Sequence, residues 1–94
     1  MIILNVFYTA AEGKRDAFLE KIDELSVATL SRAEAGCSMY DYFLARDNET
    51  DILLVEHWAD DAALAKHSAA AHFKALQEIK AEYIADVKIE KYVV

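Results

Sequence analysis

The distribution of hydrophobic and polar positions along the 94-residue chain predicts four strands and two helical regions. Runs rich in β-branched and aromatic residues, bounded by short polar segments, are typical of strands. The predicted strands cover residues 2–9, 38–46, 51–58 and 86–93. The polar segment 47–50 is short, so the second and third strands are expected to form an antiparallel hairpin.

The two remaining regions carry apolar residues at helical spacing. A single helix is predicted over residues 14–33, because one apolar stripe recurs there every three or four positions. That stripe consists of Phe18, Ile22, Leu25 and Thr29. Gly36, just beyond the helix, can adopt the left-handed backbone that commonly ends one. The second region predicts a helix over residues 60–67 and another over residues 70–83.

The order of these elements predicts an α+β fold of the ferredoxin-like type. The order is β-α-β-β-α-β, with the second helical region broken in two. Helices then cover one face of an antiparallel sheet, and residues 1–94 form a single domain. The other sheet face would expose Val, Ile, Leu and Tyr side chains, and an exposed apolar patch usually marks an interface. We therefore expect a two-fold homodimer with the sheets facing one another.

Composition narrows the possible partners. The formal net charge of −7 argues against nucleic acid and anionic membranes, because both require basic patches. No run of about 18 apolar residues is present, so no membrane-spanning helix is expected. Cys37 is the only cysteine, so the chain cannot form an internal disulfide. Its expected role is that of a small residue packed against its neighbours. Met1 is not followed by a recognisable signal peptide, so the cytoplasm is the expected location.

The candidate chemistry gathers where the strand 51–58 runs into the helix that begins at residue 60. The segment from this strand onward holds all three histidines and the only tryptophan. A small apolar pocket with a few polar groups aimed into it is the site expected at this corner. The candidate residues there are Glu56, Trp58, His67, His72 and Phe73.

Two of these residues are candidates for proton transfer. His67 could act as a general base near neutral pH, or it could end a helix and bind a backbone carbonyl. His72 could contact a ligand, or it could cap the helix that begins near Ala70. Their five-residue separation is not the four-residue spacing of a helical metal pair, and no HExxH motif occurs. No metal site is therefore predicted.

Other side chains are candidate substrate contacts, each with a structural alternative. Trp58 could form a flat wall for an aromatic ligand, or it could simply fill the core. Glu56 shares a strand face with Trp58, and a carboxylate in an apolar strand needs a partner. That partner is either a ligand or a Lys, Arg or His side chain. Asn5 could hydrogen-bond a substrate oxygen, or it could mark an edge position that faces water.

The same segments resemble the antibiotic biosynthesis monooxygenase family. The resemblance extends over nearly the whole chain, from the first strand to the last. The residues that carry it are Glu34-Ala35-Gly36-Cys37, Tyr40-Asp41, Glu56-His57-Trp58, Leu64, His67 and His72-Phe73. The resemblance implies a dimeric α+β barrel built from ferredoxin-like subunits.

For some family members, the resemblance further implies oxygenation of quinols or polyketide-type phenols without any cofactor. A base removes a phenolic proton, and the resulting anion reacts with O2 in a dry cavity. Mapped onto this chain, His67 or His72 would be the base, Trp58 and Phe73 the cavity walls, and Asn5 a polar anchor. The expected partners are thus a small aromatic substrate and O2, with neither metal nor flavin.

The family resemblance also leaves alternative functions open. Some relatives isomerise a phosphorylated sugar-derived signalling molecule, which the same histidines could do by proton transfer. Many members have no known activity, so a non-catalytic dimeric ligand-binding module is a third possibility. Haem degradation, carried out by other relatives, is disfavoured. His67 stands where those enzymes carry a Trp, and Gln77 falls close to the position of their His.

Overall fold

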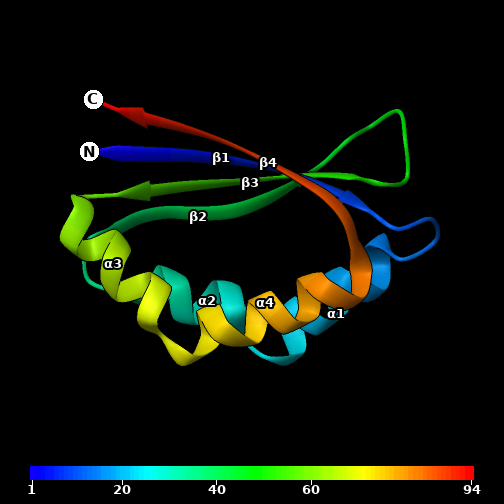
Figure 1. The fold of residues 1–94 in the computed structure, drawn as a ribbon, viewed down its shortest axis with the longest axis horizontal. Helices are drawn as coiled ribbons and strands as arrows, with labels where there is room; N and C mark the ends of the chain where they lie inside the picture. The colour runs from blue at the N-terminus through cyan, green and yellow to red at the C-terminus, as the bar shows by residue number, and fades with distance from the viewer.

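Four antiparallel strands form one sheet, and the helices lie together on one side of it (Figure 1). The computed structural model describes residues 1–94. The elements are β1 (Ile2–Ala10), α1 (Arg15–Glu24), α2 (Val27–Arg32), β2 (Cys37–Leu44), β3 (Asp51–Trp58), α3 (Asp61–Ala69), α4 (Ala71–Tyr83) and β4 (Ile84–Val93). The strand order β2-β3-β1-β4 is the ferredoxin-like arrangement, which confirms the predicted fold class.

The sheet has two unlike faces, and β3 shows why. Its residues alternate strictly between partly exposed and buried from Asp51 to Trp58. The central strand β1 follows the same rule: Val6 and Tyr8 are buried beneath the helices, whereas Phe7 on the other face is 39% exposed. The helix-covered face is therefore the core of the subunit, and the opposite face is open.

The first helical region differs from the single helix predicted over residues 14–33. The chain turns at Ser26, whose φ of 54° lies in the left-handed region, and this turn separates α1 from α2. The interruption shifts the helical phase. Leu25 and Thr29, two of the four residues in the predicted stripe, are exposed, and Val27 is buried instead.

The other predicted elements are confirmed with small shifts at their ends. The strand predicted over residues 51–58 matches β3, and it pairs with β2 as the expected antiparallel hairpin. The two helices of the second region are α3 and α4. The Asp60 side chain caps α3 by accepting a hydrogen bond from the Ala63 amide at 2.8 Å. None of the helices combines the length and the apolar character needed to cross a membrane.

Gly36 fixes a close approach between the loop before β2 and helix α3. Its φ of 87° is left-handed, as predicted, but Gly36 does not end the helix, because α2 ends at Arg32 with Ala33 as its C-cap. A Cβ at this position would lie 2.6 Å from the Cβ of Ala63, too close for two carbon atoms. The Ala59 amide also donates to the Gly36 carbonyl at 2.7 Å. Only glycine therefore lets this loop, which carries Glu34, pack against the helix that carries His67.

Candidate functional site

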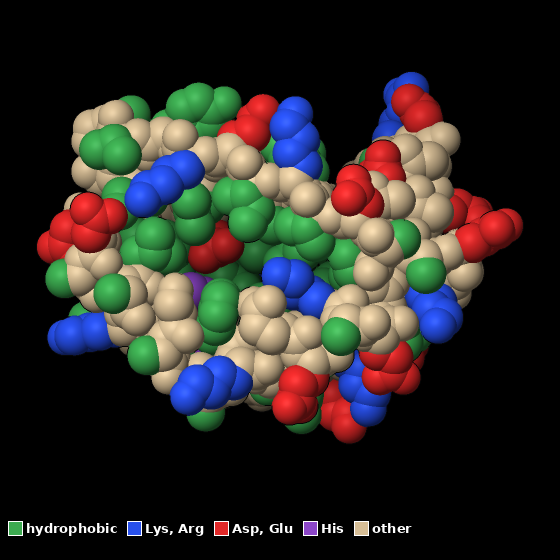
Figure 2. Space-filling model, in the orientation of Figure 1, with side chains coloured by type: hydrophobic (Ala, Val, Ile, Leu, Met, Phe, Trp, Pro, Cys, Tyr) green, Lys and Arg blue, Asp and Glu red, His purple; other side chains and the backbone are tan.

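A cavity of about 360 Å³ lies between the sheet and helices α3 and α4. Figure 2 shows this hollow with hydrophobic side chains on its walls and an acidic side chain inside it. The apolar walls come from both sheet and helices and include Leu4, Val6, Leu64, Phe73, Leu76 and Ile89. Volumes of this size fall near the lower end of small-molecule sites, so the cavity suits a ligand of one or two rings.

Glu56 lies in this cavity beside Trp58, which donates a hydrogen bond to it, and His67, which can exchange a proton with it. Both Glu56 and Trp58 point from β3 toward the helices, and Glu56 is only 6% exposed. The Trp58 Nε1–H donates to Oε1 of Glu56 at 3.0 Å, and Nε2 of His67 lies 3.8 Å from the same oxygen. Burial raises the pKa of the Glu56 carboxyl, although Trp58 and His67 partly oppose the shift. Glu56 can therefore hold or release a proton next to His67.

Trp58 is not a wall of the cavity. Its fully buried ring stacks behind His67, with the ring centroids 4.5 Å apart and the planes inclined at 33°. The predicted alternative of a core residue is thus the one observed, and the predicted wall is wrong. Trp58 supports the site indirectly, because it orients the Glu56 carboxyl through its N–H and restrains the His67 ring through stacking.

Glu34 binds both candidate histidines. Its Oε2 lies 2.5 Å from Nδ1 of His67 and 2.9 Å from Nε2 of His72. Since a carboxylate only accepts, both ring nitrogens donate to it, which assigns the proton of neutral His67 to Nδ1. Nε2 of His67 is then the proton acceptor, and it faces Glu56. In the sequence, Glu34 stands out only within the family resemblance, which assigns it no role.

The two histidines have different positions. His67 is buried, lines the cavity and contacts the Phe73 ring edge-on at 5.2 Å between centroids. His72 does not line the cavity and does not cap α4, whose N-cap residue Ala70 has no side-chain partner. It binds Glu34 instead. The geometry therefore favours His67 over His72 as the group that meets a ligand.

Glu34, His67 and His72 are also the one group whose potential ligand atoms are clustered tightly enough for a metal ion, all within 4.8 Å of one another. However, the carboxylate oxygen is at hydrogen-bond distance from both nitrogens. Ligand atoms around a tetrahedral zinc ion are roughly 3.3 Å apart, given its usual bond lengths. The observed arrangement is a hydrogen-bonded cluster, and the absence of a metal site stays a prediction.

Lys80 is a cavity residue that the sequence did not single out. It is the only cationic side chain that lines the cavity, and its Nζ lies 3.2 Å from Oε1 of Gln77. The same Nζ lies 5.6 Å from the ring centroid of Tyr8. Burial lowers the pKa of the Lys80 ammonium group, and the charge of Glu56 opposes that shift. Helical spacing places Lys80 on the same helix face as Phe73 and Leu76, but a lysine in a helix usually faces water, so the spacing alone did not assign it a role in the cavity.

Asn5 lies on the opposite face of the sheet. It pairs with Val55 and Glu90, whereas its neighbours Leu4 and Val6 line the cavity. Because successive side chains of a strand point to opposite faces, Asn5 points away from the cavity. Asn5 therefore does not reach a ligand there, contrary to the predicted role of a polar anchor.

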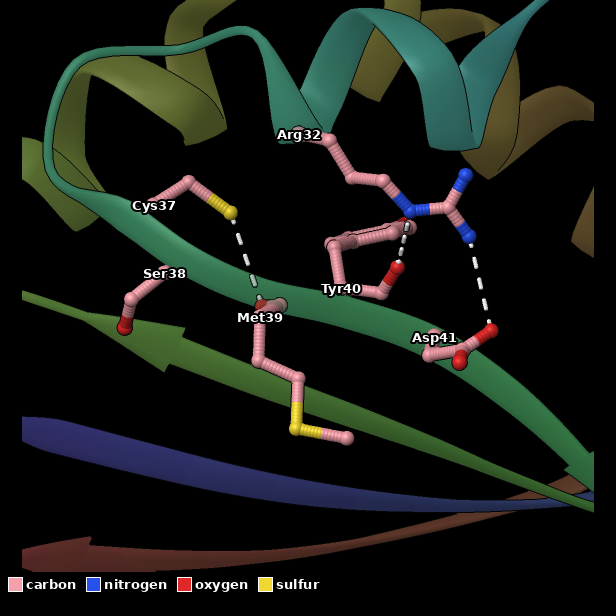
Figure 3. Close-up of a pocket in the computed structure, with 6 residues that line it drawn as sticks. All are labelled: Arg32, Cys37, Ser38, Met39, Tyr40 and Asp41. Atoms are coloured by element: carbon pink, nitrogen blue, oxygen red, sulfur yellow. Dashed lines mark hydrogen bonds and ion pairs between the residues drawn. The ribbon is translucent and has the colours of Figure 1, made fainter.

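A second hollow beside β2 is a weaker candidate. Figure 3 shows its lining, in which the Arg32 side chain reaches across to Asp41. Arg32 Nε donates to the Tyr40 carbonyl at 2.8 Å, and Nη2 lies 3.4 Å from Oδ1 of Asp41. The Cys37 thiol lies 3.5 Å from the Met39 carbonyl oxygen, and burial raises the pKa of this thiol. These polar groups already have partners, and the thiol is not activated.

The fold and the cavity define a small ferredoxin-like α+β protein with a carboxyl–histidine pair inside an apolar hollow. Residues 1–79 match the model of the family described as antibiotic biosynthesis monooxygenase. The chain belongs to this family, which confirms the resemblance seen in the sequence.

Individual relatives agree with this assignment. The Bacillus subtilis (strain 168) protein named "Putative monooxygenase YcnE" is 35% identical over 74 residues, which is 79% of this chain and 76% of the relative. The crystal structure of PA3566 from Pseudomonas aeruginosa has a TM-score of 0.89 at 31% identity, covering 99% of this chain and 92% of that one. A Nitrosomonas europaea structure, described as "Putative antibiotic biosynthesis monooxygenase", has a TM-score of 0.91 at 23% identity and covers 100% and 98%. At that identity the likeness concerns the fold alone.

Proposed function

We propose that this protein is a cofactor-independent monooxygenase that acts on a quinol or a phenolic, polyketide-type aromatic. The observation that carries the proposal is the pair formed by Nε2 of His67 and Oε1 of Glu56, 3.8 Å apart inside the apolar cavity. Membership of the monooxygenase family supports the reaction type. The apolar walls support an aromatic ligand, because they would exclude water around its ring.

In the proposed reaction, His67 is the general base. Its Nε2 accepts the phenolic proton, and the Glu34 carboxylate stabilises the positive charge that then forms on the ring. The substrate anion passes an electron to O2, and the resulting radical pair joins at a ring carbon that carries hydrogen. His67 returns its proton to give a hydroperoxide. His67 then accepts the proton of that ring carbon while hydroxide departs, which leaves a carbonyl, so one oxygen atom enters the product and the other enters water. The proton passes from His67 to the neighbouring Glu56, which has protonated the hydroxide.

The other side chains have supporting roles in this proposal. The Glu56 carboxyl, whose raised pKa favours its protonated form, can donate the proton that the departing hydroxide needs. Phe73 packs against the substrate ring as a wall of the cavity. Trp58 and His72 are positioning residues, because they contact Glu56 and Glu34 rather than the cavity.

Oxygen consumption tests the proposal. Wild-type protein is expected to accelerate O2 uptake with a menadiol-type quinol in metal-free buffer, and His67→Ala is expected to abolish most of the acceleration while keeping the wild-type circular dichroism. Lys66→Ala, an exposed neighbour on α3, is the matched control and should retain full activity. Undiminished turnover in His67→Ala would contradict the assignment of the base.

The same carboxyl–histidine pair also supports a second candidate, an isomerase that moves a proton on a small sugar-derived molecule. Glu56 and His67 are two neighbouring groups that could remove a proton at one carbon and return it at another. Product formation without O2 consumption would select this activity. Ligand binding without any turnover would select the third candidate, a non-catalytic binding module.

We further propose that the protein acts as a homodimer in the cytoplasm. The open sheet face carries a shallow apolar hollow lined by Phe7, Phe43 and Leu53, among others. Both Phe side chains are exposed in the single subunit, and a second copy of the same sheet would cover them. Cys37 is free, which agrees with a reducing compartment.

A further inference from the structure

The apolar cavity is lined by one carboxyl group and one ammonium group, and the two lie toward opposite ends of it. Figure 2 shows an acidic and a basic side chain facing the same hollow. Glu56 is the only acidic residue that lines the cavity, and Lys80 is the only lysine or arginine. The chain carries 17 acidic and 10 basic residues. Because basic residues are in the minority, the lysine in the cavity is not simply part of a basic protein surface.

Lys80 has no carboxylate partner. Lys80 takes part in none of the ion pairs of the structure. Its contacts are the neutral Gln77 amide oxygen and the face of the Tyr8 ring. Glu56 acts on Lys80 only through space. Partial burial of a cation without a counter-charge is costly, and a bound anion would offset that cost.

The Glu56 carboxyl and the Lys80 ammonium group lie toward different ends of the cavity. Phe73 contacts His67, and Lys80 follows Phe73 by seven positions on α4, which is roughly 10 Å along a helix axis. On the sheet side, Glu56 pairs with Leu4, whereas the Lys80 ammonium lies over Tyr8, four residues further along β1. A ligand that spans the cavity would therefore meet the carboxyl–histidine pair at one end and a cation at the other.

From this arrangement we propose that the substrate is an anionic hydroxyarene, a quinol or phenol whose ring system also bears a carboxylate. Its hydroxyl group lies beside His67 and Glu56, and its carboxylate pairs with the Lys80 ammonium. The inference rests on the proposed function and specifies its substrate class. Lys80 is then a specificity-determining residue: it fixes which end of the ring system enters the cavity first, and it selects carboxylated rings over neutral ones.

Binding measured without oxygen tests this inference separately from turnover. The probes are a dihydroxynaphthoate and the dihydroxynaphthalene that differs from it only in lacking the carboxylate. Calorimetric titration of the wild-type protein is expected to show about tenfold tighter binding of the dihydroxynaphthoate, the usual contribution of one charge-assisted hydrogen bond. The preference should decrease as salt is raised, because a partly exposed ion pair is screened.

Variants at two lysines of α4 provide the matched comparison. Lys80→Met keeps the length of the side chain and removes its charge, so the preference should disappear, and Lys80→Arg should restore most of it. Lys74→Met removes an exposed charge from the same helix and should leave the preference unchanged. Should Lys80→Met fail to fold, Lys80→Gln tests the same loss of charge.

The possible failures are distinguishable. Equal binding of both compounds by the wild type, or a preference that survives in Lys80→Met, would overturn the inference and leave the proposed oxygenation standing. A Lys80-dependent preference without O2 uptake would support the anionic ligand and overturn the oxygenation. If neither compound binds, the inference is wrong, and O2 uptake with the menadiol-type quinol decides the proposed oxygenation separately.

Discussion

Glu34 and His67 are 33 positions apart in the chain, and the Glu34 carboxylate accepts a hydrogen bond from Nδ1 of His67 at 2.5 Å. The same carboxylate oxygen accepts a second hydrogen bond from His72. With its Nδ1 proton held in this way, His67 presents Nε2 to Glu56 and the cavity. Glu34 therefore determines that Nε2, rather than Nδ1, is the nitrogen of His67 that accepts a proton, although Glu34 does not line the cavity.

The first prediction is that Glu34→Gln slows turnover much more than it alters substrate binding. The amide is nearly isosteric, but it lacks the charge that stabilises a protonated His67, and its NH2 group can face the ring nitrogens. We expect kcat to fall by about a hundredfold, a typical contribution of acid–base catalysis, with KM little changed. Steady-state O2 uptake over a range of pH measures the effect.

The control for this prediction is Glu20→Gln, which removes an exposed carboxylate from α1. It should match the wild type in both constants. If Glu34→Gln loses stability but keeps the wild-type kcat, then Glu34 serves only the fold.

The second prediction concerns the pH dependence of stability at Glu56. Burial raises the pKa of its carboxyl above the usual value of 4.5, so over the interval just above pH 4.5 the folded protein binds more protons there than the unfolded chain. The contribution of Glu56 to the free energy of unfolding is therefore complete at low pH and is lost as pH rises through the raised pKa.

Urea unfolding of wild type and Glu56→Gln at several pH values tests this sign. The substituted amide would keep an oxygen acceptor for the Trp58 N–H but cannot ionise, so the stability difference, wild type minus variant, should decline as pH rises above about 4.5. A difference that grows over this range would show that Glu56 is stabilised as a carboxylate in the folded protein.

The sequence predicted the sheet well because its information is local. The run of strand-forming residues from 51 to 58, preceded by the polar segment 47–50, gave the extent of β3, and the two-residue spacing of Glu56 and Trp58 gave their shared face. The break in the first helical region was missed because Ser26 adopts a left-handed conformation that no Gly or Pro announces. Asn5 was misplaced because the apolar run around it, residues 2–9, has no alternation from which a face could be assigned.

The site was harder to predict than the fold because it depends on long-range contacts. Glu34 and His72 meet across 38 positions, and no periodicity links a residue after α2 to one in α4. Lys80 shares the helical spacing of Phe73 and Leu76, but only the tertiary structure shows its ammonium group beside the Tyr8 ring. By contrast, the candidates Glu56, His67 and Phe73 do line the cavity, because β3, α3 and α4 follow one another directly in the chain.

The third prediction is that Gly36→Ala destabilises the fold more than Gly13→Ala. Both glycines have positive φ, at 87° and 76°, so both substitutions strain the backbone by about 1–3 kcal/mol. Only at Gly36 would the new Cβ collide with Ala63, since nothing lies within 4 Å of the corresponding position at Gly13. Urea unfolding measures the loss in free energy of unfolding for each variant, and the extra loss in Gly36→Ala is due to the collision. Equal losses in the two variants would show that α3 moves away freely.

The last prediction tests the proposed dimer through the two faces of the subunit. Phe43 is 45% exposed on the open sheet face, and Leu30 on α2 is 46% exposed among the helices. If a second sheet covers the open face, Phe43→Glu buries a charge in that interface, whereas Leu30→Glu adds a charge that water solvates. Light scattering should then report twice the chain mass for the wild type and for Leu30→Glu, and the mass of a single chain for Phe43→Glu.

Because the two side chains are equally exposed in one subunit, a general effect of added charge would act on both variants alike. Dissociation of Leu30→Glu with retention of the Phe43→Glu dimer would place the interface on the helices, and a monomeric wild type at micromolar concentration would remove the dimer altogether.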